Sequence, residues 1–236
     1  MESTISEILK QIKDNSVFKT ISRLQYMPYK MNISLMIVQQ IGRIRNPRFV
    51  IDADNRFTYE NLIRWVHGDP EMKSLNPAKK SILSGRLNSG IYIAGGTGTG
   101  KSWALEIMSA YCSLDNVRFK IGKSILPLQW ENFRCDAICD DFTSNGSLEK
   151  YKNLPIVGFQ DLGAEPPESL YMGNRVSVLN QILECRGDHS NKITHITSNL
   201  PLNHHEFINR YGDRVASRLY EMCNYFELTG KDRRKP

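Results

Sequence analysis

A glycine-rich stretch that ends in a lysine and a serine is the part of this sequence whose chemistry is easiest to state. Residues 95–102 read GGTGTGKS, a complete match to the pattern G-x-x-x-x-G-K-S/T of a P-loop. Glycines let such a loop curl so that its backbone N–H groups point at a phosphate. The lysine supplies a positive charge to the β- and γ-phosphates, and the last hydroxyl can ligate Mg²⁺. The stretch therefore predicts a site for a nucleoside triphosphate, ATP above all, with Mg²⁺.

The flanking sequence agrees with a P-loop. An apolar stretch at residues 91–94 predicts a strand before it, and a helix-forming stretch, WALEIMSAY, follows it. The N-terminus of that helix adds a positive end to the site. The residues expected to bind the nucleotide are Gly95, Gly96, Thr97, Gly98, Thr99, Gly100, Lys101, Ser102 and Trp103. We expect Lys101 to take part in hydrolysis as well as in binding.

A second candidate motif is acidic. Residues 154–165 read LPIVGFQDLGAE, an apolar run that ends in Gln160-Asp161. P-loop ATPases hold Mg²⁺ through an acid at the end of such a strand, and a catalytic carboxylate usually follows directly. Here Gln160 takes the first place and Asp161 the second, with Glu165 just beyond. We expect Ser102 and Asp161 to hold the metal and Asp161, helped by Glu165, to polarise water.

Gln160 leads to two competing expectations. A glutamine amide brings no negative charge, so the metal should be held less well and hydrolysis should be slow. In this interpretation Gln160→Asp raises the turnover rate and lowers the Mg²⁺ requirement. In the alternative, Asp161 is itself the metal-shell acid and Glu165 the catalytic one, so that Gln160→Asp does little and Glu165→Gln abolishes hydrolysis.

Two further polar positions follow the acidic strand. The next strand candidate ends in TSN, where Asn199 could touch the γ-phosphate or the attacking water; a simple turn before Pro201 explains it equally well. Residues 211–219 read YGDRVASRL, which places Arg214 and Arg218 on one helix face. Such a face could reach a phosphate on a neighbouring subunit, although a solvated basic face is the plainer interpretation.

The elements that must position these residues alternate between strands and helices from residue 90 onward. The predicted strands are 91–94, 117–121, 155–159, 193–197 and 224–228, and the predicted helices are 101–113, 130–143, 174–186 and 204–222, the last broken near Gly212. Such alternation implies a parallel sheet covered on both faces. The predicted fold class is therefore α/β, a five-stranded parallel sheet flanked by helices.

The first third of the chain has a helical pattern instead. The predicted helices are 4–13, opened by a capping box from Thr4 to Glu7, then 33–44, 58–67 with Thr58 as N-cap and Gly68 as stop, and 76–89. We predict two regions: residues 1–70, a small helical region, and residues 71–236, the P-loop ATPase domain. The first could be an adaptor for a partner, or it could simply pack on the core.

The overall composition and charge indicate which kinds of partner the protein could bind. The 236 residues carry a net charge of +6 and a pI of about 9.0, which favours nucleic acid as a partner, although a basic surface alone would give the same numbers. Five scattered cysteines without a CxxC pair suit reduced thiols in the cytoplasm. No targeting segment and no bilayer-spanning stretch are expected.

Together these motifs resemble the DnaC-like helicase loaders of the AAA+ superfamily, a group that includes the IstB-type transposition ATPases. The resemblance covers about residues 75–230 and rests on GGTGTGKS, QDLGAE, TSNL and GDRVASRL. It implies a P-loop NTPase fold of the AAA+ type, ATP with Mg²⁺, and a homo-oligomer with ATP at its subunit interfaces. It also implies a replicative hexameric helicase and single-stranded DNA as partners.

The resemblance also implies roles for single residues. Asn199 would be the sensor, and Arg218, with Arg214 as the alternative, would be the arginine supplied to the neighbouring subunit. Gln160 stands where the family has Asp. Two other functions stay open: an IstB-like ATPase acting on duplex DNA, and an ATP-binding scaffold that hydrolyses weakly or not at all.

Overall fold

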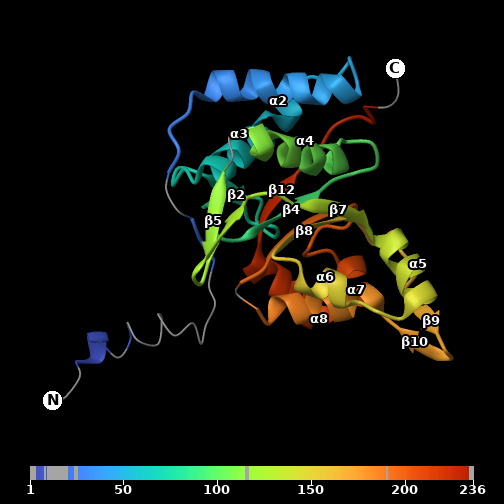
Figure 1. Cartoon of the computed structure of the whole chain (residues 1–236). Coiled ribbons are helices and arrows are strands. Elements are labelled where there is room, and N and C mark those ends of the chain that lie inside the picture. Colours follow the sequence, from blue (N-terminus) through green and yellow to red (C-terminus); the bar gives the residue numbers. More distant parts are fainter. Residues whose placement is uncertain are drawn as a thin grey trace.

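The protein is described by a computed structural model that covers residues 4–7, 9, 21–23, 26–114, 117–189 and 191–233. Its centre is a seven-stranded sheet with the strand order β3-β2-β12-β4-β11-β8-β7 (Figure 1). Five neighbouring strands run parallel: β12 (Cys223–Glu227), β4 (Gly90–Ala94), β11 (Ile193–Ser198), β8 (Ile156–Leu162) and β7 (Glu131–Arg134). Two short antiparallel strands, β2 (Lys73–Leu75) and β3 (Ile82–Ser84), continue the sheet beyond β12. The predicted five-stranded parallel core is confirmed, with a hairpin added at one edge.

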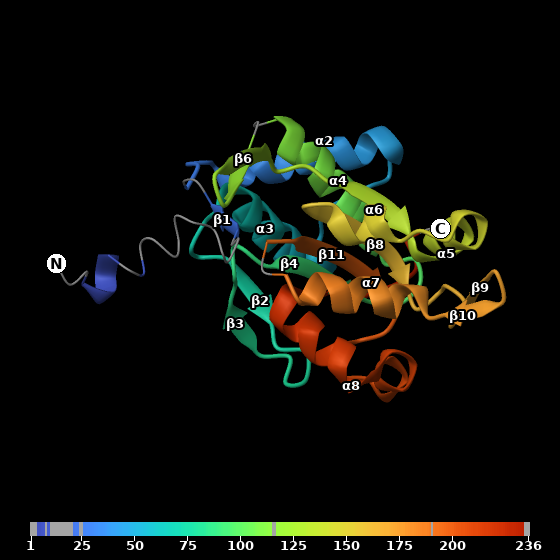
Figure 2. The same cartoon turned by 60° about the horizontal axis from the view of Figure 1, so that its bottom comes forward.

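Helices cover both faces of this sheet (Figures 1 and 2). One face carries α2 (Met31–Arg45), α3 (Ala53–His67) and α4 (Lys101–Leu114); the other carries α5 (Cys135–Asn145), α6 (Glu149–Asn153), α7 (Val178–Gly187) and α8 (His205–Met222). Successive side chains of a strand point to opposite faces. In β4, Ile91 and Ile93 therefore join the hydrophobic cluster of the first face, while Tyr92 and Ala94 join that of the second. The strands are apolar on both sides, as a parallel sheet buried between helices requires.

Several local signals have the predicted outcome. Helix α8 contains its break at Gly212, where φ is 81° and ψ is 161°. The capping box forms: the backbone N–H of Thr4 donates to Glu7 Oε2 at 2.9 Å, and that of Glu7 donates to Thr4 Oγ1 at 3.4 Å. Residues 5–7 and Leu9 are helical, and the remainder of the predicted helix 4–13 lies outside the described residues.

The predicted second strand of the core was wrong. Residues 117–121 do form a strand, β5 (Arg118–Ile121), but it pairs with β1 (Ile21–Arg23) and β6 (Ser124–Pro127) in a separate small sheet. The parallel strand beside β8 is β7, at the start of the predicted helix 130–143, and α5 begins only after it. An alternating pattern tells which side chains are buried but not which strand is the partner, so tertiary pairing decided between the two segments.

The predicted helix over residues 76–89 and two predicted helix starts were also wrong. Residues 76–89 contain β3, and the Asn76 side chain accepts bonds from Ala78 N and Lys79 N to make a turn instead of a helix cap. Helix α3 begins well before Thr58, because Asp52 and Asn55 form a capping box. Residues 174–176 are β10, which pairs with β9 (Ser169–Tyr171) before α7 begins.

The helices α2 and α3 pack on the same core as the P-loop strand. Leu35 and Val38 of α2 and Tyr59 and Trp65 of α3 belong to one hydrophobic cluster with Ile93. The division of the chain at residue 70 stays a prediction. Among the residues that the structure describes, no helix combines the length and the apolar composition that a membrane crossing requires.

Candidate nucleotide-binding site

The P-loop joins β4 to α4 at the carboxyl edge of the parallel sheet. Gly98 and Gly100 have φ of +78° and +96°, a backbone conformation that glycine adopts without steric cost. The hydroxyl of Thr99 donates to the carbonyl oxygen of Gly96 at 3.0 Å and ties the turn to itself. Because α4 begins at Lys101, its first N–H groups lie at the end of the loop. The loop thus has the local features of an anion site.

Lys101 and Asn199 meet, as the sequence predicted for a lysine and a sensor at one phosphate site. Lys101 Nζ donates to Asn199 Oδ1 at 2.7 Å and to the carbonyl oxygen of Gly96 at 2.8 Å. The two residues come together because β11 pairs directly with β4. The lysine side chain is buried, so its charge is held in place by the loop and by the neighbouring strand.

Ser102 and Asp161, the predicted metal ligands, are also brought together. The hydroxyl of Ser102 donates to Asp161 Oδ1 at 3.3 Å. Asp161 has a left-handed backbone with φ of +58°, and its N–H donates to Thr197 Oγ1 at 3.0 Å. A non-glycine residue in this conformation costs free energy that the surrounding contacts must offset. This strained residue lies near the end of β8, where the Asp161 carboxylate reaches Ser102 of the P-loop.

Gln160 is bound outside this group. Its Nε2 donates to Glu106 Oε1 at 3.1 Å and to the carbonyl oxygen of Ser102 at 3.4 Å, beneath the first turns of α4. Glu106 in turn pairs with Arg45 of α2, whose guanidinium lies 5.2 Å from the centre of the Trp103 ring. The glutamine therefore joins α4 to β8, and it does not line the cavity at the P-loop.

Glu165 is buried in contacts with α8. Its Oε1 accepts a hydrogen bond from the Tyr211 hydroxyl at 2.5 Å and lies 3.3 Å from Arg210 Nη2, and its Oε2 accepts from Gly163 N at 2.8 Å. Burial raises the pKa of the Tyr211 hydroxyl, so this group donates at neutral pH. Glu165 does not line the cavity. In this structure its carboxylate anchors α8, and a catalytic role stays a prediction.

The P-loop opens into a cavity of about 300 Å³. Part of its lining consists of predicted residues: residues 97–103, Asp161 and Asn199. It is also lined by Arg233 of the C-terminal tail and by residues that the sequence did not single out: Asn46, Arg48, Phe49, Val50, Asn55, Tyr59 and Leu228. The cavity is thus closed by the segment between α2 and α3, by α3 and by the C-terminal tail. No local motif marks these residues.

Arg134 is a further cavity residue that the sequence did not reveal. It ends β7, beside Gln160 of β8, and its Nη1 lies 3.7 Å from Asp161 Oδ2. Its Nε and Nη2 donate to the two carboxylate oxygens of Asp136 at 3.0 and 2.7 Å. The sequence analysis predicted a helix over 130–143 and so did not place Arg134 at the site. Only a strand beside β8 brings this residue to the carboxyl edge of the sheet.

Arg214 and Arg218 lie on α8 and do not line the cavity of their own chain. Arg218 Nη1 pairs with Asp188 Oδ1 at 2.6 Å, and Arg214 Nε lies 3.7 Å from Glu184 Oε1. Both arginines therefore pair with acids of α7 or of its C-cap. For either arginine to take part in hydrolysis, it would have to reach the nucleotide cavity of another subunit.

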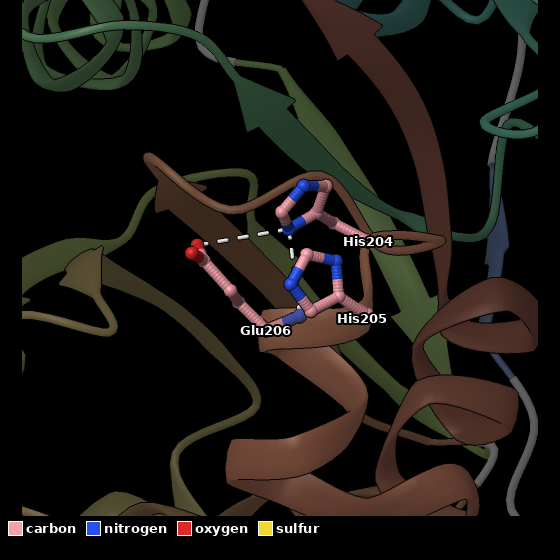
Figure 3. A group of neighbouring side chains, drawn as sticks. All are labelled: His204, His205 and Glu206. Carbon is pink, nitrogen blue, oxygen red and sulfur yellow. Dashed lines mark hydrogen bonds and ion pairs between the residues drawn. The ribbon is translucent and has the colours of Figure 1, made fainter.

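A group of three potential metal ligands stands at the start of α8. His204, His205 and Glu206 each offer one ligand atom, and these atoms lie within 4.8 Å of one another (Figure 3). His204 is the N-cap, and its Nδ1 accepts from Glu206 N at 3.4 Å. Within the described part of the chain no hydrogen bond orients the His205 ring, whereas metal-binding histidines almost always have such a bond. We assign the group to helix capping.

Asp161→Asn is expected to lower ATP turnover and raise the Mg²⁺ requirement by about 10–100-fold, the usual effect of losing a carboxylate that orients a metal shell. Gln160→Asp is expected to give no comparable gain, because position 160 lies outside the cavity and a carboxylate there would face Glu106. Turnover measured against Mg²⁺ concentration checks both, with Asp140→Asn, at an exposed residue of α5, as the control. Faster turnover at low Mg²⁺ in Gln160→Asp would return the metal role to position 160.

Comparison with known proteins gives a likeness of structure. No family model and no curated protein matches the chain in sequence. A crystal structure described as a "putative primosome component from Streptococcus pyogenes serotype M3" is 20% identical at a TM-score of 0.53, over 77% of this chain and 83% of that one. The DnaC helicase loader is 15% identical at a TM-score of 0.49, over 78% of this chain and 94% of that one. The replication initiator DnaA bound to AMPPCP and single-stranded DNA is 15% identical at a TM-score of 0.46, over 78% of this chain and 49% of that one.

The first of these likenesses shows a shared fold. The resemblance inferred from the motifs is confirmed at that level: this chain has an α/β fold whose parallel-dominated sheet is flanked by helices and carries a P-loop at its carboxyl edge.

Proposed function

We propose that this protein is an ATP-binding and ATP-hydrolysing accessory factor of DNA replication, of the helicase-loader type. The proposal is carried by the convergence of the P-loop lysine and serine with Asp161 and Asn199 on one cavity. The fold shared with a described primosome component supports a place in replication. The proposal includes a homo-oligomer with ATP at its subunit interfaces, and a cytoplasmic location where the five free cysteines stay reduced.

The residues of the site divide the chemistry among them. The loop N–H groups and Lys101 bind phosphate oxygens, and Asn199, which holds Lys101 Nζ, has an amide that can donate to the γ-phosphate or to the attacking water. The Ser102 hydroxyl and the Asp161 carboxylate suit Mg²⁺, since both are hard oxygen donors placed side by side. Mg²⁺ held there would neutralise charge on the phosphates.

The partners in this proposal are a replicative hexameric helicase and single-stranded DNA. A net charge of +6 favours an acidic partner. The N-terminal region, residues 1–70, is the proposed contact for the helicase. Co-purification with a replicative helicase in the presence of ATP tests this part of the proposal, and it should be lost without nucleotide.

Single-stranded DNA is expected to raise the rate of ATP hydrolysis more than a duplex of equal length does. Phosphate release measured with each DNA over a range of salt concentrations checks this, because binding through phosphates weakens steeply as salt rises. Lys101→Ala serves as the blank for contaminating ATPase. Stronger stimulation by the duplex would favour the IstB-type alternative, and no response to either DNA would contradict the DNA-binding part.

A second function, an ATP-binding scaffold whose partner senses the nucleotide, has one observation in its favour. Asp161 is the one carboxylate among the described residues that line the cavity. A site with a metal acid but no separate catalytic acid would bind ATP and hydrolyse it slowly. Phosphate release in the presence of DNA and helicase separates the two functions, because a scaffold would bind ATP without releasing phosphate.

A further inference from the structure

The C-terminal tail folds back over the P-loop. After β12, Leu228 N donates to the carbonyl oxygen of Ala94 at 2.8 Å, just before the loop begins, and Arg233 N donates to that of Gly98 at 3.0 Å. Figure 1 shows the tail, in red, rising from β12 to the level of α2. Residues 228–233 thus lie along one side of the nucleotide cavity, of which Leu228 and Arg233 form part of the wall.

An ion pair fastens this tail to the N-terminal half of the chain. Arg233 Nη1 and Nη2 each donate to one carboxylate oxygen of Asp52 at 2.8 Å. Asp52 is also the N-cap of α3, where it accepts from Asp54 N at 3.1 Å. The hydrogen bonds from Arg233 hold the pKa of the Asp52 carboxyl below its usual value. A bidentate pair of this kind fixes geometry as well as charge.

One guanidinium nitrogen of this arginine has no hydrogen-bond partner in the described structure. This atom, Nε of Arg233, is buried, although the residue lines the cavity. A buried donor without an acceptor costs free energy that a bound ligand can recover. Nη1 and Nη2 each donate one N–H to Asp52, so Nε is the guanidinium nitrogen for which the described structure gives no acceptor.

The cavity wall around Arg233 suits the nucleoside half of a nucleotide. Phe49 and Tyr59 stand with ring centres 5.8 Å apart and edge to face, beside the apolar side chains of Val50 and Leu228. Flat apolar walls with a few polar groups are typical of pockets that bind an aromatic ring. The P-loop and Lys101 line the same cavity, so the phosphates of a nucleotide whose base is placed here can reach Lys101.

We propose that the base and ribose of the nucleotide bind between the Phe49–Tyr59 wall and the C-terminal tail, with Arg233 as the closing residue that donates from Nε to the nucleoside. This inference rests on the proposed nucleotide function and adds the residues that hold the nucleoside. Because ATP and ADP carry the same nucleoside, the tail retains both. Release of either nucleotide requires the Asp52–Arg233 pair to open.

The test is the dissociation rate of fluorescent ADP and ATP analogues from the full chain, followed by stopped flow. Arg233→Ala is expected to release both analogues about tenfold faster or more, as for the loss of a charged donor to a ligand. Asp52→Asn, which keeps an N-cap residue but weakens the pair, should also speed release of both. Arg233→Lys keeps a charge for Asp52 but lacks Nε, so it should still release faster than the wild type.

The matched control is Arg56→Ala, an exposed arginine of α3 that pairs with Glu60 and does not line the cavity. Unchanged rates in Arg233→Ala and Arg233→Lys would overturn the proposal, and so would an effect on ATP alone, which would place Arg233 at the γ-phosphate. If the wild type bound neither analogue, the nucleotide function itself would fail, so the two failures are distinguishable. Thermal melting confirms that each variant is folded.

Discussion

Lys101→Ala is expected to raise the dissociation constant for ATP by about ten- to a hundredfold while the chain stays folded. Each hydrogen bond to a charged group contributes about 1.5–3 kcal/mol, and a tenfold change in affinity corresponds to about 1.4 kcal/mol. The lysine is buried, and its Nζ bridges the P-loop and Asn199. The sequence alone suggested a lysine exposed to ligand; the structure shows that the strand beside the loop also holds it in place.

The fold should survive this change because the lysine lies at the cavity. The two oxygens that lose a donor, of Gly96 and Asn199, can bind water from that space. Titration with a fluorescent ATP analogue measures the affinity, and a thermal melt checks the fold. Lys79→Ala, at an exposed position outside the cavity, is the matched control. Equal affinity in the Lys101 and Lys79 variants would move the phosphate site elsewhere.

Arg218→Ala is expected to leave ATP binding near normal and to slow hydrolysis in the assembled state by about 10³-fold or more, as arginines supplied between subunits do. Neither Arg218 nor Arg214 lines the cavity of its own chain, so the effect should appear only on assembly. Arg214 has the more exposed side chain, 67% against 21% for Arg218. A large effect in Arg214→Ala instead would move the assignment one helical turn back.

A mixture of variants tests action between subunits. Arg218→Ala subunits mixed with Lys101→Ala subunits should recover part of the activity, since each supplies what the other lacks. Asp188→Asn is the control, because it removes the ion pair of Arg218 but keeps the guanidinium. If Asp188→Asn slowed hydrolysis as much as Arg218→Ala does, the effect of Arg218 would come from its ion pair within its own chain and not from a neighbouring subunit. No recovery in a mixture whose assembly is verified by sedimentation would also count against the trans role.

The sequence by itself determined the parts of this protein that local chemistry encodes. The P-loop needs particular residue types at fixed spacing, so GGTGTGKS predicted its own geometry. The strands β4, β8, β11 and β12 were found because each is a short run rich in β-branched or aromatic residues between helical segments, a composition that favours strands. Gly212 predicted the break in α8, because the backbone conformation at this position is one that few other residue types adopt.

The meeting of the predicted motifs also follows from the topology. Once β4, β8 and β11 are parallel neighbours, their carboxyl ends share one edge of the sheet. Lys101, Asp161 and Asn199 all follow or end these strands, so they gather at that edge. The fold class and the phosphate end of the cavity were therefore predictable, whereas the direction in which each side chain turns was not.

Only the tertiary structure decided the remainder. The left-handed backbone at Asp161 sends its carboxylate to Ser102, while Gln160 turns to Glu106 and Glu165 to Tyr211. The choice of β7 over β5 as the fifth parallel strand brought Arg134 to the cavity. The pair of Asp52 with Arg233 joins residues that are 181 positions apart in the chain. Contacts of this kind depend on which distant segments pack together, and no local pattern of residues carries that information.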